Sequence, residues 1–148
     1  MASCAAAVPP PRGIVALVRV VLADDHAGVL AHVCLQLGKV FEIVAAVEDG
    51  KEAVDAALRL DPDVIVLDIS MPVLNGFQAA ACLRDAKCRT KIVILTMYED
   101  SEYISEAFSS GAGAYVTKRC LETDLVPAIR AVLQGDTFVS PSIAPLEV

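Results

Sequence analysis

The strongest constraint on the fold is an alternation between short, almost wholly apolar runs and longer segments with helical periodicity. Five runs rich in β-branched residues are each followed by a helical segment. A strand that is apolar at nearly every position must be buried on both faces, which is typical of parallel sheets covered by helices on two sides. The sequence therefore predicts an α/β domain made of five strand–helix units.

The expected strands and helices alternate from residue 18 onward. We expect strands over residues 19–23, 42–47, 63–67, 91–95 and 114–117. We expect helices over residues 27–37, 50–60, 76–86, 101–110 and 123–134. Gly38, Gly111 and Gly135 follow three of these helices, where a residue in the left-handed region commonly ends a helix.

Length and composition are those of one globular domain. The chain has 148 residues, of which 55% are hydrophobic, so it can bury a core without disulfides or a structural metal. Residues 1–17 join an alanine run to three prolines and are expected to be a flexible leader. We expect the domain over residues 18–135 and a linker-like tail over residues 136–148, with no DNA-binding domain in this chain.

Charge and hydropathy exclude several classes of function. Twelve basic and nineteen acidic residues give a net charge of -7, and an acidic surface repels the phosphates of nucleic acids. The longest apolar stretch, residues 13–23, contains Arg19 and is far shorter than the ~20 residues that span a membrane. The five cysteines include no C-x-x-C pair. We therefore expect reduced cysteines, a cytoplasmic location, no membrane segment and no direct binding of nucleic acid.

Polar residues follow four of the five predicted strands. Asp24 and Asp25 follow the first strand, Asp68 the third, Thr96 the fourth and Lys118 the fifth. In open α/β sheets the ligand site lies beyond the carboxyl ends of the strands. If the first and third strands are neighbours, three carboxylates converge there beside one hydroxyl and one ammonium group.

Three neighbouring carboxylates need a cation. Two like charges about 4 Å apart cost on the order of 4 kcal/mol at an effective dielectric constant of about 20. Oxygen ligands from two or three carboxylates suit Mg²⁺ or Mn²⁺. Zinc is disfavoured, because no set of histidines and cysteines follows these strands.

The same residue types match the requirements of phosphoryl transfer to a carboxylate. The metal ion and the ammonium neutralise phosphoryl oxygens, the hydroxyl donates a hydrogen bond, and one carboxylate attacks the phosphorus in line. Asp68 is the predicted nucleophile, because it is single, central and followed by turn residues. Asp24 and Asp25 are then the predicted metal ligands.

Four segments resemble the signature segments of the response-regulator receiver domain. They are LADDH (Leu22–His26), LDISMPVLNG (Leu67–Gly76), ILT (Ile94–Thr96) and GAGAYVTK (Gly111–Lys118). The closing GDTFVSPSIA is most similar to receivers of the NarL/FixJ class, which usually continue into a helix-turn-helix DNA-binding domain. The resemblance implies a flavodoxin-like (βα)5 fold with strand order 2-1-3-4-5.

The resemblance also implies roles for the site residues. Asp68 would accept a phosphoryl group from the phosphohistidine of a sensor histidine kinase. Asp25, Asp68 and the backbone carbonyl of Ser70 would bind Mg²⁺ directly, and Asp24 mainly through water.

Three further positions would bind or report the phosphoryl group. Thr96 and Lys118 would contact it, and Tyr115 would be the switch aromatic that follows Thr96. Phosphorylation would then alter a surface used for homodimerisation, and through a DNA-binding domain outside this chain it would control transcription.

Two other functions stay open on the sequence. One is a Mg²⁺-dependent phosphohydrolase with an aspartyl nucleophile, which usually has an acid two residues after the nucleophile, where Ser70 stands here. The other is a docking module that is never phosphorylated, although such a module has no reason to keep three mutually repelling acids. We expect no enzymatic activity beyond phosphorylation and dephosphorylation of the chain itself.

Overall fold

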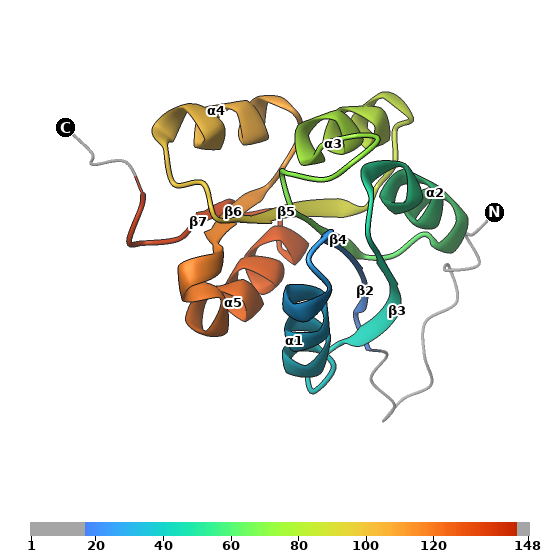
Figure 1. Cartoon of the computed structure of the whole chain (residues 1–148), viewed down its shortest axis with the longest axis horizontal. Helices are drawn as coiled ribbons and strands as arrows, with labels where there is room; N and C mark the ends of the chain where they lie inside the picture. The colour runs from blue at the N-terminus through green and yellow to red at the C-terminus, as the bar shows by residue number, and fades with distance from the viewer. Residues whose placement is uncertain (1–16, 145–148) are drawn as a thin grey trace.

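A six-stranded parallel sheet lies between two layers of helices in the computed structural model, which describes residues 17–144 (Figure 1). The strands are β2 (Arg19–Ala23), β3 (Glu42–Val47), β4 (Val64–Leu67), β5 (Lys91–Thr96), β6 (Ala114–Thr117) and β7 (Phe138–Val139). The helices are α1 (Ala27–Leu37), α2 (Gly50–Leu60), α3 (Gly76–Asp85), α4 (Ser101–Ser109) and α5 (Leu121–Leu133), and a 3-10 turn, η1, covers Lys118–Cys120. Apart from Leu17, the expected leader over residues 1–17 lies outside the described residues.

The order of the strands confirms the predicted topology. The sheet runs β3-β2-β4-β5-β6-β7, so the five predicted strands lie in the order 2-1-3-4-5. Strand β2 pairs in parallel with β3 on one side and with β4 on the other. The carboxyl ends of β2 and β4 therefore meet at the point where the chain changes direction across the sheet.

Two hydrophobic cores explain why the strands are apolar at nearly every position. Helices α2, α3 and α4 cover one face of the sheet, and α1 and α5 cover the other (Figure 1). Along β4, Ile65 and Leu67 belong to the first core and Val64 and Val66 to the second. Alternate residues of a strand point to opposite faces, so both sets must be hydrophobic. Among the residues the structure describes, no helix is long and apolar enough to cross a membrane.

The end of the described chain differs from the expected linker. Phe138 and Val139 form β7, which pairs in parallel with β6. The next residue, Ser140, is fully buried, and its amide donates to the Tyr115 carbonyl at 2.9 Å. Without this strand, β6 would present unpaired backbone groups at the sheet edge. Phe138 and Val139 are thus part of the sheet, and Ser140 is bonded to it, while the domain boundaries themselves stay predictions.

Two of the three predicted glycine caps are confirmed and one is wrong. Gly111 has φ 111° and Gly135 has φ 86°, both in the left-handed region. Gly38 has φ -63°, because the chain continues in a right-handed turn and its amide donates to the Cys34 carbonyl. A non-glycine residue, Asp61 with φ 49°, provides the left-handed cap of α2. Glycine after a helix therefore indicated the helix end correctly and its backbone conformation only in part.

Gly76 gives a test of how tightly the fold packs beside Asp68. A Cβ at Gly76 would lie 2.4 Å from the Asp68 carbonyl oxygen, whereas a Cβ at Gly28 in α1 would have no atom within 4 Å. We expect Gly76→Ala to lower the free energy of unfolding by about 1–3 kcal/mol through overpacking against backbone. The matched variant Gly28→Ala should raise it by about 0.5–1 kcal/mol, because alanine is the better helix former. Urea unfolding of both variants checks this, and equal effects would contradict it.

Candidate functional site

The polar residues at the strand ends form one compact cluster. The Lys118 ammonium lies 2.7 Å from Asp24 Oδ2 and 3.2 Å from Asp68 Oδ2. All three side chains are buried, with 9% of Lys118, 7% of Asp24 and 5% of Asp68 exposed. The structure thus brings together residues 24, 68 and 118, as the sequence predicted, with a single ammonium bridging two buried carboxylates.

Backbone hydrogen bonds fix the direction of the two buried acids. The Asp24 amide donates to the Val47 carbonyl at 3.1 Å, and the Asp68 amide donates to the Ala23 carbonyl at 3.0 Å. Each bond extends the parallel ladder by one residue beyond the strand. The two carboxylates are therefore held by the sheet itself rather than by a flexible loop.

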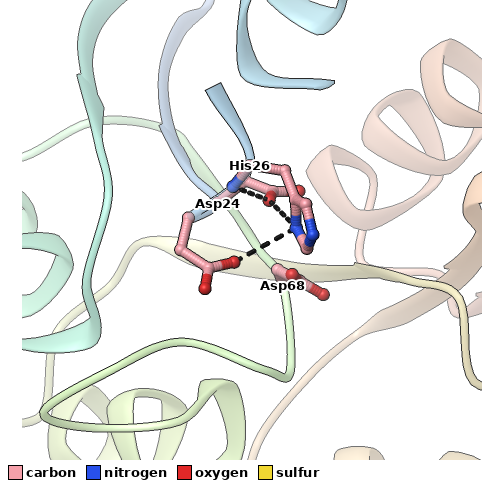
Figure 2. Close-up of side chains that lie close together, drawn as sticks. Asp24, His26 and Asp68 are labelled. Carbon is pink, nitrogen blue, oxygen red and sulfur yellow. Dashed lines mark hydrogen bonds and ion pairs between the residues drawn. The ribbon is translucent and has the colours of Figure 1, made fainter. Parts of the chain in front are cut away.

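Two exposed residues, Asp25 and His26, lie beside the buried acids of the site. The side chains of Asp24, His26 and Asp68 lie close together (Figure 2), and one ligand atom from each of Asp24, Asp25, His26 and Asp68 lies within 4.8 Å of the others. His26 Nδ1 is 3.2 Å from Asp25 Oδ1 and 3.5 Å from Asp24 Oδ1. His26 was not predicted as a site residue, although its position directly after the acid pair was the available signal.

The electrostatics of the cluster leave an excess of negative charge. Burial raises the pKa of Asp68, and the neighbouring Asp24 raises it further, while Lys118 acts in the opposite direction. The pKa of Asp68 is raised overall. The single ammonium of Lys118 therefore does not offset the cost of ionising Asp68 in a buried position beside a second carboxylate. An additional cation would stabilise the ionised form of these acids.

The two predicted switch residues are linked through a third residue, Tyr98. Thr96 is fully buried, and its Oγ1 accepts a hydrogen bond from the Tyr98 amide at 3.3 Å. Tyr115 is also fully buried, and its hydroxyl donates to the Tyr98 carbonyl at 2.8 Å. Burial raises the pKa of Tyr115, so its phenol is neutral and acts as a donor. Sequence reasoning missed Tyr98, because its role depends on backbone atoms that any residue carries.

Ser70 lies in the loop between β4 and α3, two residues after Asp68. Its side chain is exposed, and its Oγ lies 3.1 Å from the Tyr98 hydroxyl. The predicted role of Ser70 concerns its backbone carbonyl, whereas the contact that the structure shows is made by its hydroxyl. This contact joins the loop after β4 to the loop after β5.

An ion pair beside the site joins the β5–α4 loop to the end of β6. Arg119 donates to the Glu99 carboxylate from Nε at 3.0 Å and from a terminal nitrogen at 3.2 Å, and the Thr117 hydroxyl donates to the same carboxylate at 2.6 Å. The hydrogen bonds from Arg119 and then Thr117 lower the pKa of Glu99. This bidentate pair connects the loop that carries Tyr98 to the residues that follow β6.

Residues 20–130 of the chain match the family of response regulator receiver domains. The chain is 40% identical over 124 residues to the oxygen regulatory protein NreC of Staphylococcus epidermidis, a match that covers 82% of this chain and 57% of that protein. The chain thus spans less than two-thirds of the length of this relative.

Solved structures show the same relationship. A LuxR-family two-component response regulator from Aurantimonas sp. SI85-9A1 superposes with a TM-score of 0.82 and 32% identity, covering 86% of this chain and 93% of that one. The signal receiver domain of the putative response regulator NarL from Mycobacterium tuberculosis superposes with a TM-score of 0.78 and 28% identity. This match covers 81% of this chain and 98% of that one. Because the family match extends over most of the chain and includes every strand end that forms the site, the chain belongs to the response regulator receiver family, as found in NarL- and NreC-type two-component regulators.

Proposed function

We propose that Asp68 accepts a phosphoryl group from the phosphohistidine of a sensor histidine kinase. An Asp68 oxygen forms a bond to phosphorus while the bond from phosphorus to the imidazole nitrogen breaks, and the imidazole retains that electron pair and takes up a proton. The observation that carries the proposal is the position of Lys118, whose ammonium lies against the buried carboxylates of both Asp24 and Asp68. This arrangement places positive charge where phosphoryl oxygens would gather.

The residues present fit a hard divalent cation. Asp24, Asp25 and Asp68 supply carboxylate oxygens close together, and the raised pKa of Asp68 indicates a deficit of positive charge. We expect Asp25, Asp68 and the Ser70 carbonyl to hold Mg²⁺ or Mn²⁺ directly and Asp24 to act mainly through water. Such an ion, when bound, neutralises charge on the phosphoryl oxygens.

Thr96 and Lys118 retain donors for the phosphoryl group. The Thr96 hydroxyl oxygen accepts from the Tyr98 amide, and no acceptor among residues 17–144 takes its O–H, which can therefore donate. The Lys118 ammonium has three N–H groups and contacts one oxygen on each of two carboxylates. Both groups can therefore bind phosphoryl oxygens without giving up these contacts.

A switch would follow from the contacts between Thr96, Tyr98 and Tyr115. Phosphorylation adds a charge of about -1.5 to -2. Movement of Thr96 toward that charge would shift the Tyr98 amide, and through the Tyr98 carbonyl it would shift the buried Tyr115 hydroxyl. We expect the affected surface to be formed by α4, β6 and α5, and to control homodimerisation in the cytoplasm. Transcriptional output would then use a DNA-binding domain outside this chain, in line with the matched structure from Staphylococcus aureus that is described as a DNA-binding response regulator of the LuxR family.

Intact mass spectrometry tests the proposal. After incubation with acetyl phosphate and Mg²⁺, we expect one phosphoryl adduct, and digestion should place it on the peptide that contains Asp68. EDTA should prevent the adduct, because the carboxylates then lack their cation. Absence of any adduct together with absence of Mg²⁺ binding would contradict the proposal and favour a docking module.

Turnover of an external substrate distinguishes the remaining alternative. A phosphohydrolase would release phosphate from a substrate such as p-nitrophenyl phosphate over many cycles. We expect no such turnover, because Ser70 cannot act as the general acid that a leaving group needs. On this proposal the chain catalyses only its own phosphorylation and dephosphorylation.

A further inference from the structure

The predicted nucleophile is almost inaccessible in this structure. Only 5% of the Asp68 side chain is exposed, and Asp24, Thr96 and Lys118 around it are also buried or nearly so. A phosphodonor must bring its phosphorus in line with a carboxylate oxygen. Some group at the rim of the site must therefore move before Asp68 can react.

One side-chain hydrogen bond joins the two loops that follow Asp68 and Thr96. The loop after β4 begins with Asp68 and carries Ser70, and the loop after β5 follows Thr96 and carries Tyr98. The Ser70 Oγ and the Tyr98 hydroxyl lie 3.1 Å apart. Ser70 is exposed and Tyr98 is 40% exposed, so water can replace each partner when the bond breaks. The link is thus weak enough to open reversibly.

Aromatic packing holds the Tyr98 ring in place for this bond. Its ring stacks on Tyr103 of α4 with centroids 4.6 Å apart, and Tyr103 in turn faces Phe77 of α3 at 6.3 Å. The Tyr98 amide donates a hydrogen bond to the Thr96 hydroxyl oxygen, and the Tyr98 carbonyl accepts one from the Tyr115 hydroxyl. A single residue therefore contacts the loop that follows Asp68 through its hydroxyl, and the switch residues through its backbone.

We propose that Tyr98 is a positioning residue whose hydrogen bond to Ser70 latches the phosphorylation site closed. The inference deepens the proposed function and rests on it. Opening of the latch admits the donor to Asp68, and the same motion displaces the backbone groups that hold Thr96 and Tyr115. Access to the site and the state of the switch are thereby coupled through one side chain.

Two substitutions remove the latch from opposite ends. Tyr98→Phe keeps the aromatic stack and removes only the hydroxyl, and Ser70→Ala removes the partner while keeping the backbone carbonyl. Loss of one neutral hydrogen bond shifts an opening equilibrium by roughly two- to tenfold. We expect each variant to form the acetyl phosphate adduct faster by that factor. The double variant should be no faster than either single variant, because all three lack the same bond.

Tyr103→Phe is the matched control. It removes a hydroxyl from the ring stacked on Tyr98. Among the described residues, the Tyr103 hydroxyl has no hydrogen-bond partner. The rate of adduct formation should therefore stay within twofold of that of the unsubstituted chain. The Mg²⁺ dissociation constant should be the same in Tyr98→Phe, in Tyr103→Phe and in the unsubstituted chain. Amide hydrogen exchange at residues 69–75 and 97–100 should become faster in Tyr98→Phe and Ser70→Ala only.

The outcomes separate the latch from the proposed function. Unchanged or slower phosphorylation in Tyr98→Phe, or additive effects in the double variant, would overturn the latch while leaving Asp68 as the acceptor. If the unsubstituted chain forms no adduct, the proposed function is at fault, and hydrogen exchange then decides whether the latch exists. Exchange that is equal in Tyr98→Phe and Tyr103→Phe would overturn it.

Discussion

Replacing Asp68 by asparagine is expected to abolish the phosphoryl adduct and, in the absence of metal, to make the domain more stable. The amide has no nucleophilic oxygen anion, so no phosphorus bond can form. Burial raises the pKa of Asp68, which means that the ionised carboxylate costs folding free energy at neutral pH. We expect Asp68→Asn to raise the free energy of unfolding at neutral pH in the absence of metal, and with it the melting temperature, because the neutral amide carries no charge that must be buried.

The dependence on pH follows from the direction of the shift. The folded state keeps the Asp68 proton to higher pH than the unfolded chain does. The destabilisation caused by the ionised, buried carboxylate is therefore absent below the ordinary aspartate pKa of about 3.9, grows as the pH rises through it, and is complete above the raised pKa of the folded state. The advantage of Asp68→Asn should therefore be full at neutral pH and should vanish as the pH falls below the ordinary aspartate range. Thermal unfolding in EDTA at several pH values measures this.

Two comparisons make the result specific. Asp25→Asn removes a more exposed acid of the same cluster and should change stability less. Saturating Mg²⁺ should stabilise the unsubstituted chain through binding to the folded state, and so narrow the difference from Asp68→Asn. A variant less stable than the unsubstituted chain in EDTA would contradict the prediction, because Lys118 would then stabilise the carboxylate by more than burial costs.

Replacing Lys118 by alanine is expected to have the opposite effect on stability. The Lys118 ammonium contacts both buried carboxylates. Its removal leaves Asp24 and Asp68 buried without this ion pair. Breaking a buried ion pair by removing one partner costs about 3–5 kcal/mol. Lys118→Ala should lower the urea midpoint accordingly and slow adduct formation, because the phosphoryl group loses an ammonium contact.

Lys51→Ala provides the control for Lys118→Ala. Lys51 pairs with Asp55 on the exposed face of α2, where both side chains are more than half exposed. Such a surface pair contributes about 0.3–0.5 kcal/mol. Added Mg²⁺ should restore part of the stability of Lys118→Ala, since a second cation then faces the acids, and should leave Lys51→Ala unaffected. A loss in Lys118→Ala as small as that in Lys51→Ala would show that the two acids do not depend on the ammonium.

The sequence alone determined the layered fold and most of the buried site. Strands such as Val64–Leu67 are apolar at every position because both faces are buried, and that requirement is visible in the residues themselves. Asp24, Asp68 and Lys118 could be placed together because each directly follows a strand, and parallel strands bring their carboxyl ends to one edge. These predictions depend on local periodicity and on the strand order that the resemblance to receiver domains implies.

The tertiary structure decided the features that depend on contacts between distant segments. Tyr98 reaches Ser70 with its hydroxyl and Tyr115 with its backbone carbonyl, and no sequence spacing encodes either contact. Strand β7 forms because the edge of β6 is free to pair, which a short segment containing proline does not reveal. Sequence patterns report which faces of each element are buried. The partner of an individual hydrogen bond is fixed only when the packed elements set the distance between two loops.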